Sequence, residues 1–151
     1  MNYRILCIGK IKDAFYREAI ADLSRQINKG NNRLEILEFP DEKIPEHLKE
    51  NQKEQFLEKE CRKMAEKLTG RDYVIALCIE GKEITTKQHK EYVRQAMENG
   101  YERITYVIGG SLGLPQQIKE RADIKLSFSK MTFPHQMMRM VLCEEIVNIL
   151  R

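Results

Sequence analysis

Apolar residues along the chain form two patterns: short continuous or alternating runs, typical of strands, and spacings of three and four residues, typical of helices. Segments of the two kinds alternate from one end of the chain to the other. Short apolar runs at residues 3–9, 33–39, 72–81, 103–110 and 123–129 predict five β-strands. The run at 72–81 (DYVIALCIEG) is almost continuously apolar. Such a run is typical of a strand that is buried on both faces of a parallel sheet.

Helical spacing fills the segments between these strands. In residues 13–28, apolar side chains three and four positions apart lie on one helical face: Tyr16, Ile20, Leu23 and Ile27. Similar patterns predict helices at 54–68, 86–99 (with Thr86 as its cap) and 134–150, and a short one from Pro115, whereas 41–52 is a charged loop. Strands that alternate with helices predict a single three-layer α/β domain over residues 1–151, with a mostly parallel sheet.

The predicted last helix is apolar nearly all round, which is unusual for a helix that covers only one sheet face. Its apolar residues are Met137, Met138, Met140, Val141, Leu142, Ile146, Val147, Ile149 and Leu150. A helix of this kind is either deeply buried or shared with another subunit. Its position at the end of a short chain favours a homodimer interface.

Composition places the chain among globular proteins. Of its 151 residues, 42% are hydrophobic and 32% charged, and the net charge of +3 permits a nucleic-acid partner without requiring one. No apolar run approaches the roughly 18 residues that span a bilayer, and the N-terminus passes directly into a strand. These features predict a cytoplasmic protein that has no membrane partner and keeps reduced thiols at its four scattered cysteines: Cys7, Cys61, Cys78 and Cys143.

Three glycines follow the fourth predicted strand directly, in the segment YVIGGSLGL. Glycines at the carboxyl end of a sheet let the backbone come close to a ligand. The spacing of Gly109, Gly110 and Gly113 is GGxxG, which matches neither a dinucleotide-binding GxGxxG motif nor a P-loop. A ligand-binding turn and a purely structural tight turn both remain open.

A second unusual segment, LSFSKMTFPHQMMR, ends the fifth strand and begins the last helix. Ser127 and Ser129 flank Phe128, so the loop offers backbone groups and small hydroxyls that can read the edge of a purine ring. Pro134 is sterically suited to the first helical turn. His135 follows it and is either a packing or capping residue or a general base.

These segments resemble the RlmH (YbeA-like) family of the SPOUT methyltransferase superfamily. The resemblance rests on SKMTFPHQMMR and the glycine turn, together with ILCIGKIKDAFYREAI, PDEK and VIALCIEGK, and it covers essentially the whole chain. It implies a homodimer that transfers a methyl group from S-adenosylmethionine to N3 of a pseudouridine in the 23S rRNA of the assembled ribosome. It also implies a C-terminal trefoil knot, whose loops hold the cofactor.

The resemblance carries site residues over to this sequence. The implied cofactor-binding residues are Leu77, Gly109, Phe128, Ser129, Lys130, Met131, Thr132 and Phe133. The sulfonium methyl is already activated, so no metal is expected. The N3 proton must leave, and positive charge near the uracil oxygens favours the resulting anion. Candidate catalytic residues for these roles are Arg139, Glu144 and His135.

The sequence departs from the family pattern near its C-terminus. The family's last helix usually reads EQxYRA and continues into a short tail that ends near Tyr-His, whereas this sequence reads EEIVNIL and ends at Arg151. Val147 and Asn148 therefore stand where Tyr and Arg are usual. Besides an active methyltransferase, the alternatives are a catalytically impaired paralogue or truncated copy that still dimerises and can bind S-adenosylmethionine, and a nucleotide-binding regulator without methyl transfer.

Overall fold

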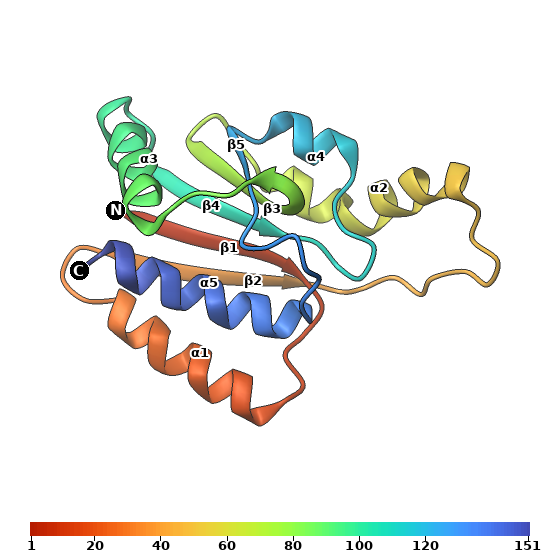
Figure 1. Cartoon of the computed structure of the whole chain (residues 1–151), viewed down its shortest axis with the longest axis horizontal. Coiled ribbons are helices and arrows are strands. Elements are labelled where there is room, and N and C mark those ends of the chain that lie inside the picture. The colour runs from red at the N-terminus through yellow and green to blue at the C-terminus, as the bar shows by residue number, and fades with distance from the viewer.

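Five parallel strands form one sheet in the computed structural model, which describes residues 1–151 (Figure 1). The strand order is β2-β1-β4-β3-β5. Each neighbouring pair of strands is parallel, so all carboxyl ends meet at one edge of the sheet. The strands are β1 (Asn2–Ile8), β2 (Arg33–Phe39), β3 (Asp72–Lys82), β4 (Arg103–Ile108) and β5 (Ile124–Leu126). The prediction of five strands in a parallel sheet is confirmed.

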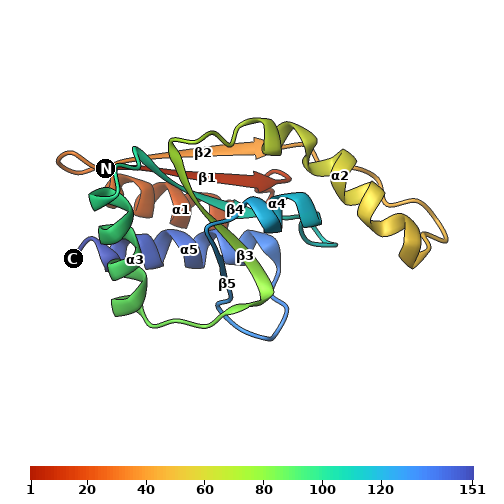
Figure 2. The ribbon, with the colours of Figure 1, turned by 90° about the horizontal axis from the view of Figure 1, so that it is seen from above.

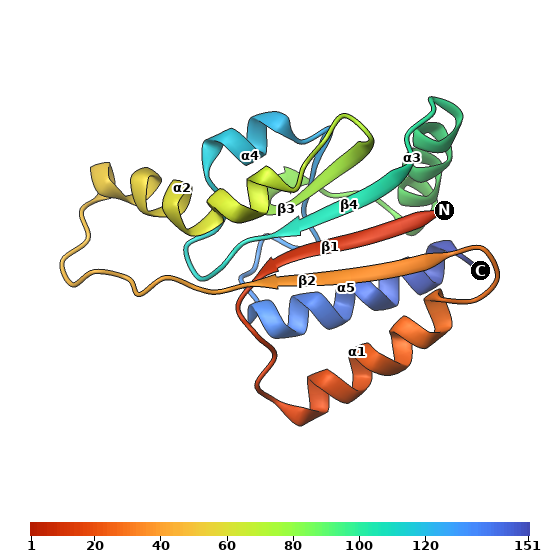
Figure 3. The same ribbon diagram turned by 180° about the vertical axis from the view of Figure 1, so that it is seen from behind.

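Helices cover both faces of this sheet and complete three layers (Figures 2 and 3). On one face α1 (Ala14–Ile27), α3 (Thr86–Glu98) and α5 (His135–Ile149) enclose the larger apolar core. On the other face α2 (Glu50–Glu66) and α4 (Gln116–Arg121) enclose a smaller one. The three-layer α/β prediction is confirmed. No helix is long and apolar enough to cross a membrane.

Several predicted boundaries differ from the structure. The charged segment 41–52 is not entirely a loop, because α2 already begins at Glu50. Thr86 does not cap α3: the hydroxyl of Thr85 accepts from the amide of Gln88 at 3.1 Å, and the Gln88 side chain accepts in return from the amide of Thr85 at 2.8 Å. Finally, β5 has only three residues. Capping and end effects of this kind do not depend on the apolar period, so the period could not reveal them.

The prediction that β3 is buried on both faces is confirmed for the first half of the strand only. Asp72, Val74, Ile75 and Ala76 are buried, whereas Ile79 is 48% exposed. The pairing of β3 with β5 shifts register between Leu77 and Lys82. The second half of β3 therefore projects beyond the covered part of the sheet, at its carboxyl edge.

Helix α5 is covered largely by its own chain. It packs against α1 and α3 as well as the sheet, and Leu142, Cys143, Ile146, Val147 and Ile149 are buried. Most of its apolar circumference is therefore satisfied without a second subunit. A stripe with Val141 exposed and Met137 and Met140 half-buried remains for a partner. The homodimer stays a prediction.

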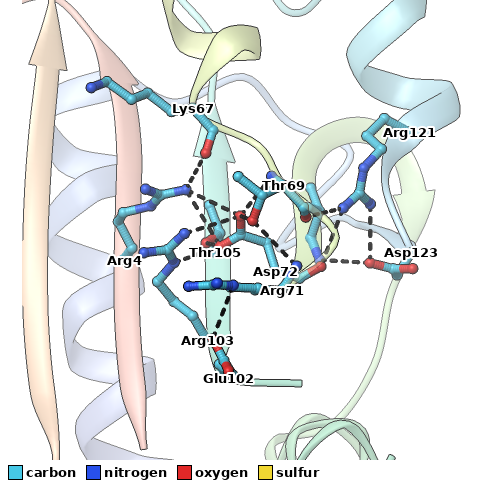
Figure 4. Close-up of polar contacts among 11 residues, drawn as sticks. Arg4, Lys67, Thr69, Arg71, Asp72, Glu102, Arg103, Thr105, Arg121 and Asp123 are labelled. Atoms are coloured by element: carbon cyan, nitrogen blue, oxygen red, sulfur yellow. Dashed lines mark hydrogen bonds and ion pairs between the residues drawn. The ribbon is translucent and has the colours of Figure 1, made fainter. Parts of the chain in front are cut away.

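A fully buried carboxylate joins the amino ends of three strands (Figure 4). Asp72, at the start of β3, accepts from the guanidinium of Arg103 at 2.5 Å, the hydroxyl of Thr105 at 2.6 Å and the amide of Thr69 at 2.8 Å. Arg4 of β1 lies 3.4 Å away and also donates to the carbonyl of Lys67, just beyond α2. One side chain thus connects β1, β3, β4 and the end of α2.

Burial alone would raise the pKa of Asp72, but its partners reverse this effect. Hydrogen bonds from Arg103, Thr105 and Thr69, together with the charge of Arg4, bring the pKa well below its usual range. The carboxylate is therefore ionised in the folded protein throughout the neutral range. A carboxyl whose folded pKa is depressed stabilises the fold above its unfolded pKa of about 3.9.

A second close contact joins β3 to the strand beside it. A Cβ placed on Gly81 would lie 2.8 Å from the backbone of Lys125 and Leu126. The amide of Ser127 donates to the carbonyl of Lys82 at 3.0 Å immediately afterwards. Two segments more than 40 residues apart in sequence therefore cross in direct backbone contact. The trefoil knot implied by the family resemblance stays a prediction.

Asp72→Asn is expected to lower the free energy of unfolding at pH 7 by about 3–5 kcal/mol, because it leaves buried positive charge unpaired. In the wild type the contribution of Asp72 is complete above about pH 4 and is lost as the pH falls below that value. Urea unfolding of both proteins between pH 2 and pH 7 measures this. Equal acid sensitivity in the two proteins would contradict the role given to Asp72.

Gly81→Ala is expected to lower the free energy of unfolding by about 1–3 kcal/mol, because the added methyl meets backbone rather than a movable side chain. Gly70→Ala is the matched control, since a Cβ at Gly70 meets nothing within 4 Å. Chemical denaturation of both variants measures the difference. A Gly81 variant as stable as the Gly70 variant would mean that the two segments are free to separate.

Candidate functional site

A cavity of about 790 Å³ lies at the carboxyl edge of the sheet. Its walls come from three segments: the second half of β3, the glycine turn after β4, and the chain from the end of β5 into α5. The lining from these segments includes Leu77–Glu80, Ile108–Leu114, Leu126–Ser129 and Met131–His135. In a parallel sheet this edge is the usual place for a ligand, because loops meet there and backbone groups are free.

The glycine turn forms one wall of this cavity. The amide of Gly113 donates to the carbonyl of Gly110 at 3.1 Å, and Gly113 has a φ of +93°, which favours glycine. A Cβ on Gly109 would lie 2.4 Å from the carbonyl oxygen of Gly113. Both positions therefore require glycine for the turn itself. The turn leaves Gly109, Gly110 and Ser111 facing the cavity.

The loop at 127–133 forms the opposite wall. Its two serines are not free hydroxyls, because each already bonds to the backbone of the loop. Ser127 donates to the carbonyl of Ser129 at 2.9 Å, and the hydroxyl of Ser129 accepts from the amide of Met131 at 3.0 Å. The serines therefore shape the loop, and its remaining backbone groups and the hydroxyl proton of Ser129 are available to a ligand.

Seven of the eight residues named for cofactor binding line this one cavity, and only Lys130 does not. They come from β3, the glycine turn and the 127–133 loop, so the fold brings together positions that are up to 56 residues apart in sequence. Lys130 is exposed outside the cavity, and its neighbour Met131 is 72% exposed. The roles of all eight residues in cofactor binding stay predictions.

Of the three candidate catalytic residues, His135 alone lines the cavity. It begins α5, and Pro134 before it is the N-cap rather than part of the first turn. Burial, and then the charge of Arg139, lowers the pKa of His135, so the imidazole is neutral at pH 7. Its Nδ1 is buried without a hydrogen-bond partner. A neutral imidazole is able to accept a proton, and because Nδ1 is buried, a substrate in the cavity would have to use the other ring nitrogen, Nε2.

Arg139 lies behind the cavity wall and is only 1% exposed. Its guanidinium pairs with Glu38 at 2.6 Å and donates to the carbonyls of Ile8 at 3.4 Å and Gly9 at 3.1 Å. These contacts join α5 to the carboxyl ends of β1 and β2. A side chain enclosed in this way holds the start of α5 in place, and the catalytic role named for Arg139 stays a prediction.

Glu144 is exposed and lies away from the main cavity. It lines a second cavity of about 300 Å³ between α3 and α5, which shares Leu126 and Phe128 with the first. Beside it His89, fully buried, contacts the hydroxyl of Tyr106 at 2.7 Å and the carboxylate of Glu145 at 3.2 Å. Glu144 and His135 therefore line different cavities, both of which include Phe128.

Sequence reasoning missed several lining residues, because they are brought in by neighbouring elements. Lys53 of α2 and Lys119 of α4 both line the cavity, and Lys119 pairs with Glu80 at 2.5 Å. Glu80 follows Leu77 in the same strand, so the rule that ligands bind at carboxyl strand ends could have indicated it. Lys53 and Lys119 carry no such signal, because helical register alone does not say which lysine faces a site.

The cavity suits an organic ligand rather than a metal ion. No group of three or more His, Cys, Asp or Glu side chains is arranged to hold a metal. Apolar side chains such as Leu77, Leu114 and Met138 share the lining with free backbone groups of two loops. A pocket with mainly apolar walls and a few polar groups is typical of small-molecule and cofactor sites.

Comparisons with known proteins agree with this geometry. The family model described as "Predicted SPOUT methyltransferase" matches residues 1–150. A curated protein of Leuconostoc citreum (strain KM20), "Ribosomal RNA large subunit methyltransferase H", is 42% identical over 146 residues, covering 97% of this chain and 91% of that protein. "Ribosomal RNA large subunit methyltransferase H 1" of Clostridium perfringens (strain SM101 / Type A) is 40% identical over 151 residues, covering 100% and 94%.

A solved structure shows the same fold at much lower sequence identity. It is "a probable methylase family protein from Haemophilus influenzae Rd KW20", with a TM-score of 0.55 and 12% identity. The match covers 97% of this chain, which spans about 65% of the length of that one. At this identity the likeness concerns the fold alone. The family model, in contrast, extends over nearly every residue, and the chain belongs to the SPOUT methyltransferase family.

Proposed function

We propose that this protein transfers a methyl group from S-adenosylmethionine to ribosomal RNA of the large subunit, at N3 of a pseudouridine in the assembled ribosome. The observation that carries the proposal is the cavity at the carboxyl edge, lined by the glycine turn and the 127–133 loop. These are the segments that the family resemblance assigns to the cofactor. The names of the relatives from Leuconostoc and Clostridium supply the class of substrate.

The lining residues fit the parts of S-adenosylmethionine. Leu77, Leu126 and Phe128 offer apolar surface to an adenine ring, and the loop backbone offers hydrogen bonds to its edge. Lys53, half-buried and in no ion pair, offers positive charge to a carboxylate. When bound, the cofactor supplies an activated methyl group. The protein's part is to hold that group in line with the acceptor nitrogen, at a distance of about 3–3.5 Å.

The acceptor nitrogen must lose its proton during transfer. His135 faces the cavity with a neutral imidazole, so it is our first choice as proton acceptor. Glu144 is the second, reached through the smaller cavity. Arg139 is a positioning residue in this proposal, because its bonds hold the start of α5, and with it His135, against β1 and β2. A homodimer, which the exposed stripe of α5 around Val141 would allow, belongs to the same proposal.

A cofactor-binding protein without transferase activity is the second candidate. The observation in its favour is that His135 alone among the three candidate catalytic residues lines the cavity. Val147, at the position where the family usually has tyrosine, is a buried core residue with no reactive group. The two candidates share the cofactor site and differ only in methyl transfer to RNA.

Gly109→Val is expected to abolish binding of S-adenosylmethionine, because the side chain would collide with the carbonyl of Gly113 and displace the glycine turn. Calorimetric titration with S-adenosylmethionine measures this, with Gly70→Val as the matched control. The dimer, measured by sedimentation, is expected to persist in both variants. Saturable binding to the Gly109 variant with wild-type affinity would remove the glycine turn from the site.

His135→Gln is expected to lower kcat by about a hundredfold, as for loss of a general base, while the Kd for S-adenosylmethionine stays the same. Transfer of labelled methyl to unmethylated large ribosomal subunits measures kcat. Because the pKa of His135 is lowered, the wild-type rate should persist as pH falls from 7 and should drop only below about 6.5, where the imidazole protonates. A variant with the same rate and pH profile would assign the proton to another group.

A further inference from the structure

The loop that leaves β1 lies beside the cavity and is held there by several bonds. A Cβ on Gly9 would lie 3.4 Å from Cε1 of His135, which lines the cavity. The side-chain oxygen of Gln136 accepts from the amides of Lys12 at 3.2 Å and Asp13 at 3.4 Å. The loop is therefore attached to the start of α5, next to the residue we propose as proton acceptor.

Further contacts fix the shape of this loop. The Glu38 carboxylate, paired with Arg139, also accepts from the amide of Ile11 at 3.1 Å. Arg17 donates to the carbonyls of Ile11 at 3.3 Å and Lys12 at 3.5 Å. Backbone groups on both sides of the loop are thus occupied. What the loop presents to a partner is consequently its side chains, on a rigid support.

Those side chains are two unpaired lysines and an exposed aromatic ring. Phe15 is 66% exposed and makes only an edge contact with Tyr16, with the ring centroids 5.4 Å apart. Lys10 and Lys12 are exposed, and neither forms an ion pair. We call Lys10, Lys12 and Phe15 the β1–α1 surface. A single exposed ring is ordinary on a protein surface. Beside two free cations and next to the cavity, this one is placed to contact an anionic partner.

Two acidic groups beside the loop are already engaged. Asp13 caps α1 by accepting from the amide of Phe15 at 2.9 Å, and Glu38 is paired with Arg139. Across residues 10–17 the charges are Lys10, Lys12 and Arg17 against Asp13, which is three minus one, or +2. A polyanion therefore meets a net positive charge here, which is still three minus two, or +1, when the exposed Glu18 that follows is counted.

We propose that the β1–α1 surface binds a single-stranded segment of RNA next to the nucleotide that is methylated. Lysines supply attraction to phosphates, and an exposed ring supplies a face on which an unstacked base can lie. On the cavity itself, exposed Met131 and half-exposed Phe133 offer further apolar contact to bases. The inference rests on the proposed function for the identity of the RNA, and it assigns residues that make the contact.

The test separates RNA contact from cofactor binding and from methyl transfer. The variants are Phe15→Ala and the double variant Lys10→Ala with Lys12→Ala. Phe15→Tyr keeps the ring, and Lys29→Ala removes an exposed lysine beyond the other end of α1. Three quantities are measured for each: the Kd for unmethylated large ribosomal subunits by co-sedimentation at several salt concentrations, the Kd for S-adenosylmethionine, and the oligomeric state.

Phe15→Ala is expected to weaken subunit binding by about tenfold, as for loss of one base stack, and Phe15→Tyr should restore it. The double lysine variant should weaken binding and lower the slope of log Kd against log salt by about 1.5. Lys29→Ala should leave both quantities as in the wild type. The Kd for S-adenosylmethionine and the oligomeric state should not change in any variant.

Other results overturn the assignment. Subunit binding equal to the wild type in Phe15→Ala would remove the ring from the RNA contact. A dimer that dissociates in Phe15→Ala would show that the surface meets a second copy of the chain. Lost cofactor affinity would make the loop part of the cofactor site. Because subunit binding is measured without turnover, absence of methyl transfer in the wild type would count against the proposed function and not against this surface.

Discussion

The buried carboxylate of Asp72 is the interaction on which the arrangement of the sheet depends. It lies at the amino edge, where it bonds to side chains of β4, is paired with Arg4 of β1, and is linked through Arg4 to the end of α2. A slip in register would leave Arg4, itself buried, without its partner, and an uncompensated buried charge costs several kcal/mol. With the amino ends aligned in this way, the carboxyl ends of β3 and β4 open together onto the cavity.

Around the cavity, the opposite edge is built on close backbone approach, and the ion pair of Arg139 with Glu38 joins α5 to it. Gly81 lets β3 meet the backbone of Lys125 and Leu126, and Gly109 lets the glycine turn close on Gly113. These contacts leave no room for side chains at Gly81 and Gly109, so backbone groups share the walls of the cavity with apolar side chains such as Leu77 and Phe128. The buried carboxylate of Asp72 lies at one edge of the sheet, and the loops that line the cavity lie at the other.

The sequence was informative about this site wherever the signal was local. The glycine turn and the 127–133 loop each occupy one continuous segment, and turn chemistry of this kind is readable from neighbouring residues. The ion pair of Arg139 could not be predicted from the sequence, because its partner Glu38 is 101 positions away and nothing near Arg139 indicates it. His89 escaped notice for the same reason, since Tyr106 and Glu145 reach it from other elements.

By itself, the sequence determined the order of strands and helices, the parallel sheet and the family, because apolar period and contiguous motifs are properties of neighbouring residues. Tertiary structure alone decided which polar side chains line the cavity and which form buried contacts that stabilise the fold. His135 and Arg139 are one helical turn apart, yet one lines the cavity and the other is enclosed by β1 and β2. The direction of a side chain depends on what packs around its helix, and that is settled only when distant segments meet.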